Sequence, residues 1–509
     1  MKKSNSLLGA TLSVSLLAVF VKLLGFVREA LIAAYYGATA ETDAFFFAEG
    51  MPNTFFPAVG SSLALAFTSL YIQKRETKGE EISERYASRM ICMSALLGVV
   101  LGVLGVAASP LLVPLFAPGF SGKQQELAIV LTRLIMGTVV LTVLQYMLSA
   151  VLNAKKHFMP AQIAALSHNM AIIAIIVLFT HGHDMVFLMI AVIAGMAVQV
   201  AVLLLCCCRH FTYIRGLSPF HRDTWHLFRM AFPVLLGNSI IQINNIVDKA
   251  LGSTLPEGSL SALNYANNLT AFVISVFITS LATTLYPTLA AKAAEESDGF
   301  GKALLQSIGG LSLVLIPISC ITVIDAKDIV SVVYARGSFD QTAVFYTALA
   351  LSWYAPMFPW AGIRDILTRA FYAVQNTKIP MRNSAVGVGC NIMFSLLFVR
   401  WLGLVGIALG TAISSVITAV LLLWNAHKYL PSLRLRPLFW ELGKQFLAGI
   451  FLLTALLIFR RFLHFPHPAV QFTADTIWGF ICYFLALRLL GSEELRIAAQ
   501  LVQSKLRRS

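Results

Sequence analysis

Residues 185–208 read MVFLMIAVIAGMAVQVAVLLLCCC and contain no charged side chain. A helix needs about 20 mainly apolar residues to cross the hydrocarbon core of a bilayer, and this stretch is long enough. Similar apolar runs recur from one end of the chain to the other. The strands of a transmembrane barrel would be shorter and would alternate strictly between apolar and polar residues. The pattern therefore indicates an all-α polytopic membrane protein.

The composition of the whole chain agrees with this assignment. The 509 residues are 58% hydrophobic and only 12% charged, about half the charged share of a soluble domain. The formal net charge of +14 would suggest nucleic-acid binding in a soluble protein. In a membrane protein it follows from the excess of Lys and Arg in cytoplasmic loops. Soluble enzymes are excluded, we expect no nucleic-acid partner, and the cysteine spacing suggests no metal site.

The apolar pattern predicts about 14 transmembrane helices. Lys and Arg are concentrated at both ends of the chain and in the loops that follow even-numbered helices, whereas the loops after the first, fifth and seventh helices have none. This asymmetry predicts that both termini are cytoplasmic, with exceptions such as Arg460 and Arg461. The expected spans are 7–36, 43–72, 87–116, 125–153, 160–181, 185–208, 226–252, 258–290, 302–324, 341–373, 380–400, 402–425, 438–460 and 468–490.

The chain contains an internal repeat. AVLNAKKHFMP ends at Pro160 and AFYAVQNTKIP ends at Pro380, an offset of 220 residues. Both copies straddle a predicted cytoplasmic loop, so the repeat predicts two pseudo-symmetric six-helix lobes related by an axis along the membrane normal. The lobes would be residues 1–220 and 221–430, with two extra helices and a basic cytoplasmic tail in residues 431–509. The alternative is a chance similarity between two loop–helix junctions.

Ionisable residues are unusually frequent in the first two expected spans. Burying a charge at bilayer depth costs several kcal/mol, so such residues usually face a cavity or a partner. Cations there could bind an anionic head group, with carboxylates holding them in place. The alternatives are that long side chains near helix ends reach water and that Asp43 belongs to a helix cap. The residues are Lys22, Arg28, Glu29, Asp43 and Glu49.

Later spans carry further polar groups. Asp248 and Lys249 lie in the seventh span, and Arg364 lies in the tenth. Asp365 and Arg369 are four residues apart, a spacing that also allows pairing along one helix. Oxygen ligands from separate helices are what a small hard cation needs, and Asn391, Ser395 and Thr411 offer them. The alternative is that these side chains join helices by hydrogen bonds.

Three segments resemble the MurJ/MviN family of the multidrug/oligosaccharidyl-lipid/polysaccharide exporter superfamily. They are KLLGFVREALIAAYYGATAETDAFFFAEGMPN at 22–53, RAFYAVQNTKIP at 369–380 and GLVGIALGTAIS at 403–414. The resemblance implies a flippase that moves lipid II, the undecaprenyl-diphosphate-linked peptidoglycan precursor, to the outer leaflet of the bacterial cytoplasmic membrane. It implies alternating access, a central cavity between two lobes, and a groove for the polyprenyl tail formed by the last two helices.

The resemblance also assigns residues. The family's charged first-helix triplet matches Lys22, Arg28 and Glu29, and its second-helix aspartate matches Asp43. With Glu49 and Arg364, these form the expected substrate-binding set. The implied Na⁺ site comprises Asp248, Asn391, Ser395, the carbonyl of Ile407, and Thr411.

Besides Lys22, which stands where the family has an arginine, the chain departs from the family at three places. The stretch Thr54–Phe67 carries no charge where the family has an arginine and a glutamate. Asn267 and Asn268 replace an Asp–Arg pair, and Ser395 replaces a carboxylate. A cavity with fewer arginines should bind a diphosphate less tightly or differently.

We therefore expect a transporter without catalytic residues, driven by Na⁺ or the membrane potential. Its partners would be an undecaprenyl-linked saccharide lipid, membrane lipids and the cell-wall synthesis machinery. One alternative substrate is another lipid-linked exopolysaccharide or O-antigen-type unit. From other classes, a membrane glycosyltransferase or ligase would need acid/base residues, usually with a sizeable extramembrane loop. The extra two helices and the basic first span argue against a small-molecule cation antiporter.

Overall fold

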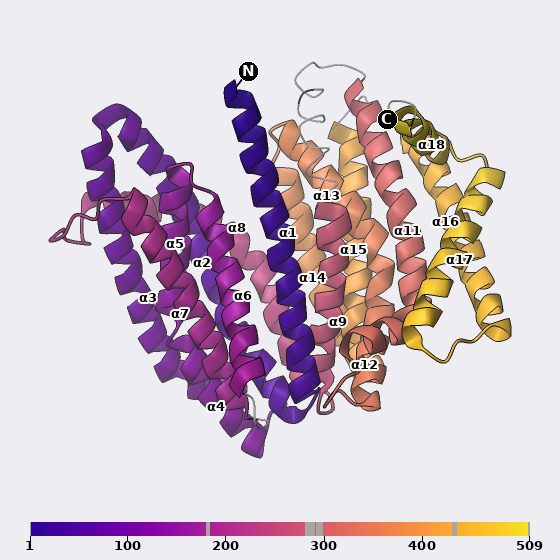
Figure 1. The fold of residues 1–509 in the computed structure, drawn as a ribbon, viewed down its shortest axis with the longest axis horizontal. Helices are drawn as coiled ribbons and strands as arrows, with labels where there is room; N and C mark the ends of the chain where they lie inside the picture. Colours follow the sequence, from indigo (N-terminus) through magenta and orange to yellow (C-terminus); the bar gives the residue numbers. More distant parts are fainter. Residues whose placement is uncertain (1, 180–183, 280–290, 292–298, 430–434, 507–509) are drawn as a thin grey trace. The chain divides into compact units, whose positions relative to one another are not determined.

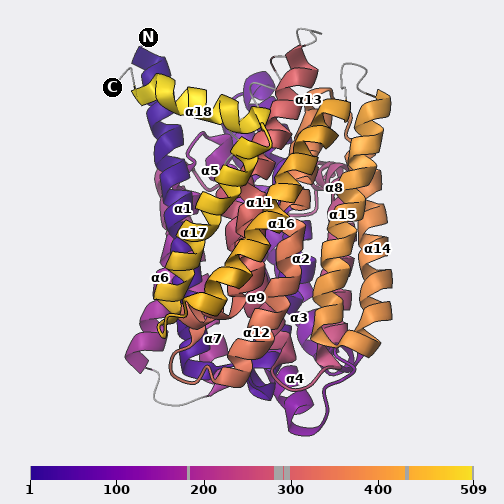
Figure 2. The ribbon, with the colours of Figure 1, turned by 90° about the vertical axis from the view of Figure 1, so that its right-hand side faces the viewer.

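The computed structural model describes residues 2–179, 184–279, 291, 299–429 and 435–506, and no strand occurs among them. By packing, the chain divides into two compact units, Met1–Ser261 and Ala262–Ser509. The expected lobes at 1–220 and 221–430 rest on the internal repeat rather than on packing, so that division stays a prediction. Figures 1 and 2 follow the helices in chain order.

The first unit is built mainly of α-helices. They are α1 (Lys2–Tyr36), α2 (Ala40–Lys78), α3 (Glu80–Phe116), α4 (Gly122–Met136), α5 (Val139–Ala154), α6 (Met159–Phe179), α7 (Met185–His210), α8 (Arg222–Ser253) and the start of α9 (Ser259–Val273). A capping box begins α2: the backbone N–H of Thr42 donates to Thr39 Oγ1, and that of Thr39 donates to Thr42 Oγ1. These bonds satisfy two N–H groups that the helix itself leaves unpaired.

The second unit continues from α9 through a π-helical turn, η1 (Ile274–Thr279). The remaining elements are α11 (Gly299–Tyr334), α12 (Gln341–Tyr354), η2 (Ala355–Met357), α13 (Phe358–Ala373), α14 (Lys378–Leu402), α15 (Leu404–Tyr429), α16 (Leu435–Phe462), α17 (Pro468–Leu489) and α18 (Glu493–Leu506). Leu313 of α11, Leu452 of α16 and Tyr483 of α17 share one buried apolar cluster. This packing holds α16 and α17 against α11, and Figure 2 shows the three helices side by side.

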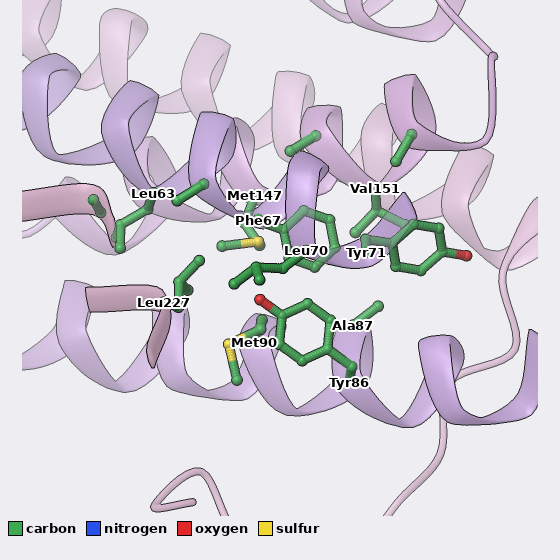
Figure 3. Packing of buried hydrophobic residues seen from close by; sticks show 14 of the residues in the cluster. Leu63, Phe67, Leu70, Tyr71, Tyr86, Ala87, Met90, Met147, Val151 and Leu227 are labelled. Carbon is green, nitrogen blue, oxygen red and sulfur yellow. The ribbon is translucent and has the colours of Figure 1, made fainter. Parts of the chain in front are cut away.

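The apolar core of the first unit joins four helices. Phe67 of α2 stacks on Tyr86 of α3, with ring centroids 5.5 Å apart. Met147 of α5 and Leu227 of α8 belong to the same cluster, and Figure 3 shows these side chains converging. The uncharged stretch that departs from the family pattern runs into this core, so its last turns are occupied by helix packing.

Eleven segments of the described chain are long and apolar enough to cross a membrane. They confirm an all-helical polytopic membrane protein. The expected spans 7–36, 226–252 and 341–373 coincide with α1, α8 and the α12–η2–α13 segment, which are not among the eleven. The number of fourteen spans therefore stays a prediction.

The two copies of the repeat end their first helix in the same way. After α5, Lys156 has φ 66°, and the next N–H, of His157, donates to Leu152 O at 2.9 Å. After α13, Gln375 has φ 57°, and the N–H of Asn376 donates to Phe371 O at 2.9 Å. Each is a Schellman turn with a left-handed residue other than glycine. The two turns lie within one position of the offset that relates the prolines, and they support a true repeat over a chance similarity.

Candidate functional site

The charged residues of α1 form an ion pair. Arg28 Nη2 donates to Glu29 Oε1 at 2.6 Å, and the two side chains are only 18% and 10% exposed. Adjacent helical residues point about 100° apart, so both side chains turn toward each other to meet. Arg28 Nη1 lies 3.5 Å from Nε2 of His168 on α6. The helix pattern of the sequence did not indicate His168.

Two residues from other helices extend this cluster. Glu49 of α2 interacts electrostatically with Arg28 and with Lys249 of α8. Lys249 Nζ lies 3.5 Å from the carbonyl oxygen of Phe46. Gly50 makes this approach possible, because a Cβ added there would lie 1.2 Å from Lys249 Nζ. Two cations and two carboxylates therefore gather within the first unit, and we call Arg28, Glu29, Glu49, Lys249 and His168 the charged cluster.

The charged cluster has unused hydrogen-bonding capacity. Within the part of the chain that the structure describes, Arg28 Nε and Glu29 Oε2 are buried and make no hydrogen bond. Leaving such an atom unsatisfied costs about 1–3 kcal/mol. The guanidinium can therefore bond an additional acceptor, such as a phosphate oxygen, while keeping its contact with Glu29.

The other two expected cations lie on α1 and α13. Lys22 is exposed on α1, six residues before Arg28. Arg364 belongs to α13 of the second unit and is half-buried. Next to it, Arg369 Nε donates to Asp365 Oδ2 at 3.0 Å, which confirms pairing along one helix. Substrate roles for Lys22 and Arg364 stay predictions.

Asp43 joins α2 to the beginning of α9. Its carboxylate accepts the backbone N–H groups of Gly258 and Ser261, each at 2.7 Å, and the Ser261 hydroxyl at 2.6 Å. A carboxylate at a helix N-terminus is stabilised by the unpaired N–H groups there. Asp43 thus has a structural role, and its role toward a substrate stays a prediction.

Four of the five expected Na⁺ ligands meet between α14 and α15. Asn391 Oδ1 accepts the Ser395 hydroxyl at 2.9 Å, and Asn391 Nδ2 donates to Thr411 Oγ1 at 3.4 Å. The Thr411 hydroxyl donates to the Ile407 carbonyl at 3.1 Å. All are neutral oxygen donors, the chemistry that suits a hard cation, and they also join the two helices by hydrogen bonds.

The fifth expected ligand, Asp248, belongs to α8 in the first unit. Asn244 Nδ2 donates to Asp248 Oδ2 at 3.0 Å, while Asp248 Oδ1 is buried and unpartnered among the described residues. A carboxylate with a free buried oxygen also fits a cation ligand. No group of three or more His, Cys, Asp or Glu side chains suited to a metal occurs in the described ranges, so any cation here would depend largely on neutral oxygens.

An apolar groove of about 590 Å³ lies in the second unit between α13, α15 and α16. Trp360 of α13 stacks on Phe446 of α16, with ring centroids 5.7 Å apart, at its side. Further lining residues include Leu423, Trp424, Phe439 and Leu442. Residues of α13, α15 and α16 line this groove. The expected groove for the polyprenyl tail, between the last two transmembrane helices, stays a prediction.

Comparison with known proteins assigns a family. The family model "Lipid II flippase MurJ" matches residues 32–471. A Buchnera aphidicola (Acyrthosiphon pisum) protein named "Probable lipid II flippase MurJ" is 29% identical over 429 residues, covering 82% of this chain and 83% of that protein. A protein of the same name from Aquifex aeolicus is 28% identical over 421 residues, with 81% of each chain covered.

Solved structures show the same fold. An inward-closed lipid II flippase MurJ superposes with a TM-score of 0.81 at 22% identity, covering 94% of this chain and 98% of that one. An inward-facing multidrug resistance MATE transporter gives a TM-score of 0.71 at 17% identity, with coverages of 81% and 95%. The likeness to MurJ extends over nearly the whole chain, and the family model covers most of it. This protein therefore belongs to the lipid II flippase MurJ family.

Proposed function

We propose that this protein is a flippase that moves lipid II, an undecaprenyl-linked saccharide lipid, from the inner to the outer leaflet of the bacterial cytoplasmic membrane. The observation that carries the proposal is the family match over residues 32–471. The helical fold and the apolar segments long enough to span a membrane support a transporter rather than an enzyme. Both termini would be cytoplasmic, and the cell-wall synthesis machinery would use the product.

The charged cluster would hold the diphosphate of the head group. Arg28 and Lys249 are its two cations, and Arg28 has an unpartnered donor on its Nε atom. Hydrogen bonds between ionised partners are about twice as strong as neutral ones. Glu29 and Glu49 orient the cations and balance their charge before substrate binds. Lys22 and Asp43 would complete the binding set of the first unit, and the role of Arg364 in the second unit stays a separate prediction.

The tail of the substrate would stay in an apolar environment while the head group crosses. The groove between α13, α15 and α16 offers about 590 Å³ lined by aromatic and aliphatic side chains. The polyprenyl chain is already in an apolar solvent, so the groove would bind part of it through packing contacts rather than through transfer out of water. The groove supports a lipid-linked substrate over a small hydrophilic one.

A cation would reset the cycle. Asn391, Thr411 and the Ile407 carbonyl of the second unit would hold Na⁺, with Ser395 supporting Asn391. Asp248 of the first unit stays the fifth ligand that the family resemblance implies. The membrane potential offers a second driving force, since one elementary charge crossing 100 mV is worth about 2.3 kcal/mol.

Complementation tests this function in cells. We expect the wild-type protein to keep bacteria growing after depletion of their own lipid II flippase. Arg28→Ala should fail at equal membrane abundance, because it removes the cation that Glu29 and His168 position. Arg336→Ala is the matched control, since that arginine is exposed and its Nη2 donates to the Val332 carbonyl at the end of α11 at 3.1 Å. Normal growth with Arg28→Ala would contradict the assigned role.

The alternative to lipid II is another undecaprenyl-linked saccharide as substrate. The uncharged stretch Thr54–Phe67 and the Asn267–Asn268 pair leave the chain with fewer cations than the family pattern. If the wild-type protein is inserted and abundant but does not support growth, another undecaprenyl-linked saccharide becomes the substrate to test in the same strain.

A further inference from the structure

A second charged group lies in the second unit, at the turn between α16 and α17. Arg460 of α16 contacts three carboxylates at once. Its Nε donates to Asp475 Oδ2 of α17 at 2.7 Å, and its Nη2 contacts Asp325 Oδ1 and Asp328 Oδ2 of α11. The group joins α11 to the two helices that fall outside the internal repeat. We call these four residues the Arg460 cluster.

The charges of the Arg460 cluster do not balance. One guanidinium faces three carboxylates, so the group would carry −2 if every acid were ionised. Asp325 and Asp475 are both 0% exposed, and uncompensated charge in such a place costs several kcal/mol. Burial at this depth therefore requires a further positive charge within the Arg460 cluster.

The position for that charge is defined by two oxygens. Arg460 uses Oδ1 of Asp325 and Oδ2 of Asp475, and Gln471 Nε2 also donates to the latter at 2.9 Å. The other two oxygens, Asp325 Oδ2 and Asp475 Oδ1, are buried and have no partner within the described ranges. Both carboxyl groups contact the same guanidinium, which brings Asp325 and Asp475 together. Both are acceptors when ionised, so only an added proton or cation makes this contact favourable.

We propose that Asp325 and Asp475 form a proton-binding site that holds one exchangeable proton between them. Two carboxyl groups that share a site cannot both ionise readily and commonly keep one proton. The proton comes from water and adds to one of the two unpartnered oxygens, which changes the net charge of the Arg460 cluster from −2 to −1. Asp328 and Arg460 are 18% and 24% exposed, and they connect the pair to water.

A proton fits the site better than a metal ion. The guanidinium already occupies the side of the carboxylates where a cation would bind. The described chain also contains no group of three or more His, Cys, Asp or Glu side chains that could hold a metal. The charged or titratable groups that flank the Arg460 cluster along the chain are exposed, so water screens them. They are Lys327, Arg336, Asp340, Arg461, His464 and His467. Three other titratable groups on the same helices are not exposed, namely Cys320, Tyr483 and Glu441, and Glu441 pairs with Lys444 at 3.5 Å.

The site would make the attachment of α16 and α17 depend on pH. With the proton bound, Arg460 and the shared hydrogen bond tie both helices to α11. When the proton leaves, two buried carboxylates repel each other across the same contact. This role is separate from binding of the head group and the tail, because the Arg460 cluster has no residue in common with the charged cluster or with the lining of the apolar groove.

Infrared spectroscopy of the full-length protein in lipid nanodiscs tests the proposal. A protonated carboxyl group has a C=O stretching band that an ionised carboxylate lacks. We expect the wild-type protein to show such a band that disappears as the pH is raised. Asp325→Asn and Asp475→Asn should each lose it. Asp328→Asn is the matched control and should keep it, because Asp328 does not contact the shared pair through an unpartnered oxygen.

Three results would overturn the proposal. They are retention of every protonated-carboxyl band in both asparagine variants, loss of the band in Asp328→Asn alone, and removal of the band by Na⁺ at constant pH. Asp325→Glu guards against misfolding, since it keeps a carboxyl group and should shift the band in frequency rather than abolish it. The readout does not depend on transport, so failure of the proposed lipid II function would leave this test unaffected.

Discussion

Arg28 meets two partners at once, the neighbouring Glu29 and His168 on α6. The sequence predicted the importance of Arg28 and Glu29 because charges within an apolar span are costly. It could not predict His168, which is 140 residues away from Arg28 in the chain. A single histidine in an apolar helix has no spacing that links it to another helix. Residue chemistry was therefore readable from the sequence, whereas contacts between distant helices were not.

Glu494, at the beginning of α18 and outside the membrane spans, should make stability depend on pH. Burial, followed by the charges of Glu441 and Glu493, raises its pKa from 4.5 to about 7. The folded protein then binds this proton more readily than the unfolded chain does. Its contribution to stability is complete below pH 4.5 and is lost as the pH rises through 7. The melting temperature should fall over that interval.

Substitution of Glu494 tests whether this residue, rather than another acid, causes the pH dependence of the melting temperature. Glu494→Gln cannot ionise, so its melting temperature should fall less between pH 4.5 and 7 than that of the wild-type protein. Glu76→Gln is the control, because Glu76 is exposed on α2 and is not among the groups that raise the pKa of Glu494. Equal pH profiles for Glu494→Gln and the wild-type protein would show that Glu494 does not titrate in this way.

At the scale of the helices, apolar length and the repeat were the informative signals. The repeat at Pro160 and Pro380 corresponds to two Schellman turns with the same hydrogen bonds. The expected pairing of Asp365 with Arg369 also formed, since four residues is one helical turn. Asp43 shows what such local patterns cannot predict. It lies in the first turn of α2, next to the capping box, yet its carboxylate accepts N–H groups at the beginning of α9.

Two glycine substitutions should have opposite effects. Gly50→Ala would displace Lys249 Nζ, the flexible end of a side chain, while alanine favours the helix by up to about 1 kcal/mol. We expect unchanged or higher stability but impaired transport. Gly98→Ala would bring Cβ within 2.6 Å of the Val140 backbone and should cost about 1–3 kcal/mol. Melting curves and complementation would measure both effects, and full transport by Gly50→Ala would count against a role for Lys249.

At the scale of the whole molecule, the sequence predicted a polytopic helical membrane protein of the MurJ/MviN family, and the family model and the fold confirmed it. The charge-poor composition predicted the membrane protein, and the quoted motifs predicted its family. The Arg460 cluster was not predicted, because Asp325, Arg460 and Asp475 come from three helices. Arg460 appeared only as an exception to the positive-inside pattern. Its partners explain the exception, since three carboxylates hold it at this position.

The central claim is best tested with the purified protein in liposomes that contain lipid II. The measurement is the amount of lipid II that becomes accessible to a membrane-impermeant reagent on the opposite leaflet. We predict rapid transfer by the wild-type protein. Transfer by Arg28→Ala should be at least about tenfold slower, because a hydrogen bond to a charged group contributes about 1.5–3 kcal/mol. No transfer by a folded, reconstituted wild-type protein, or equal transfer by the two proteins, would contradict the account.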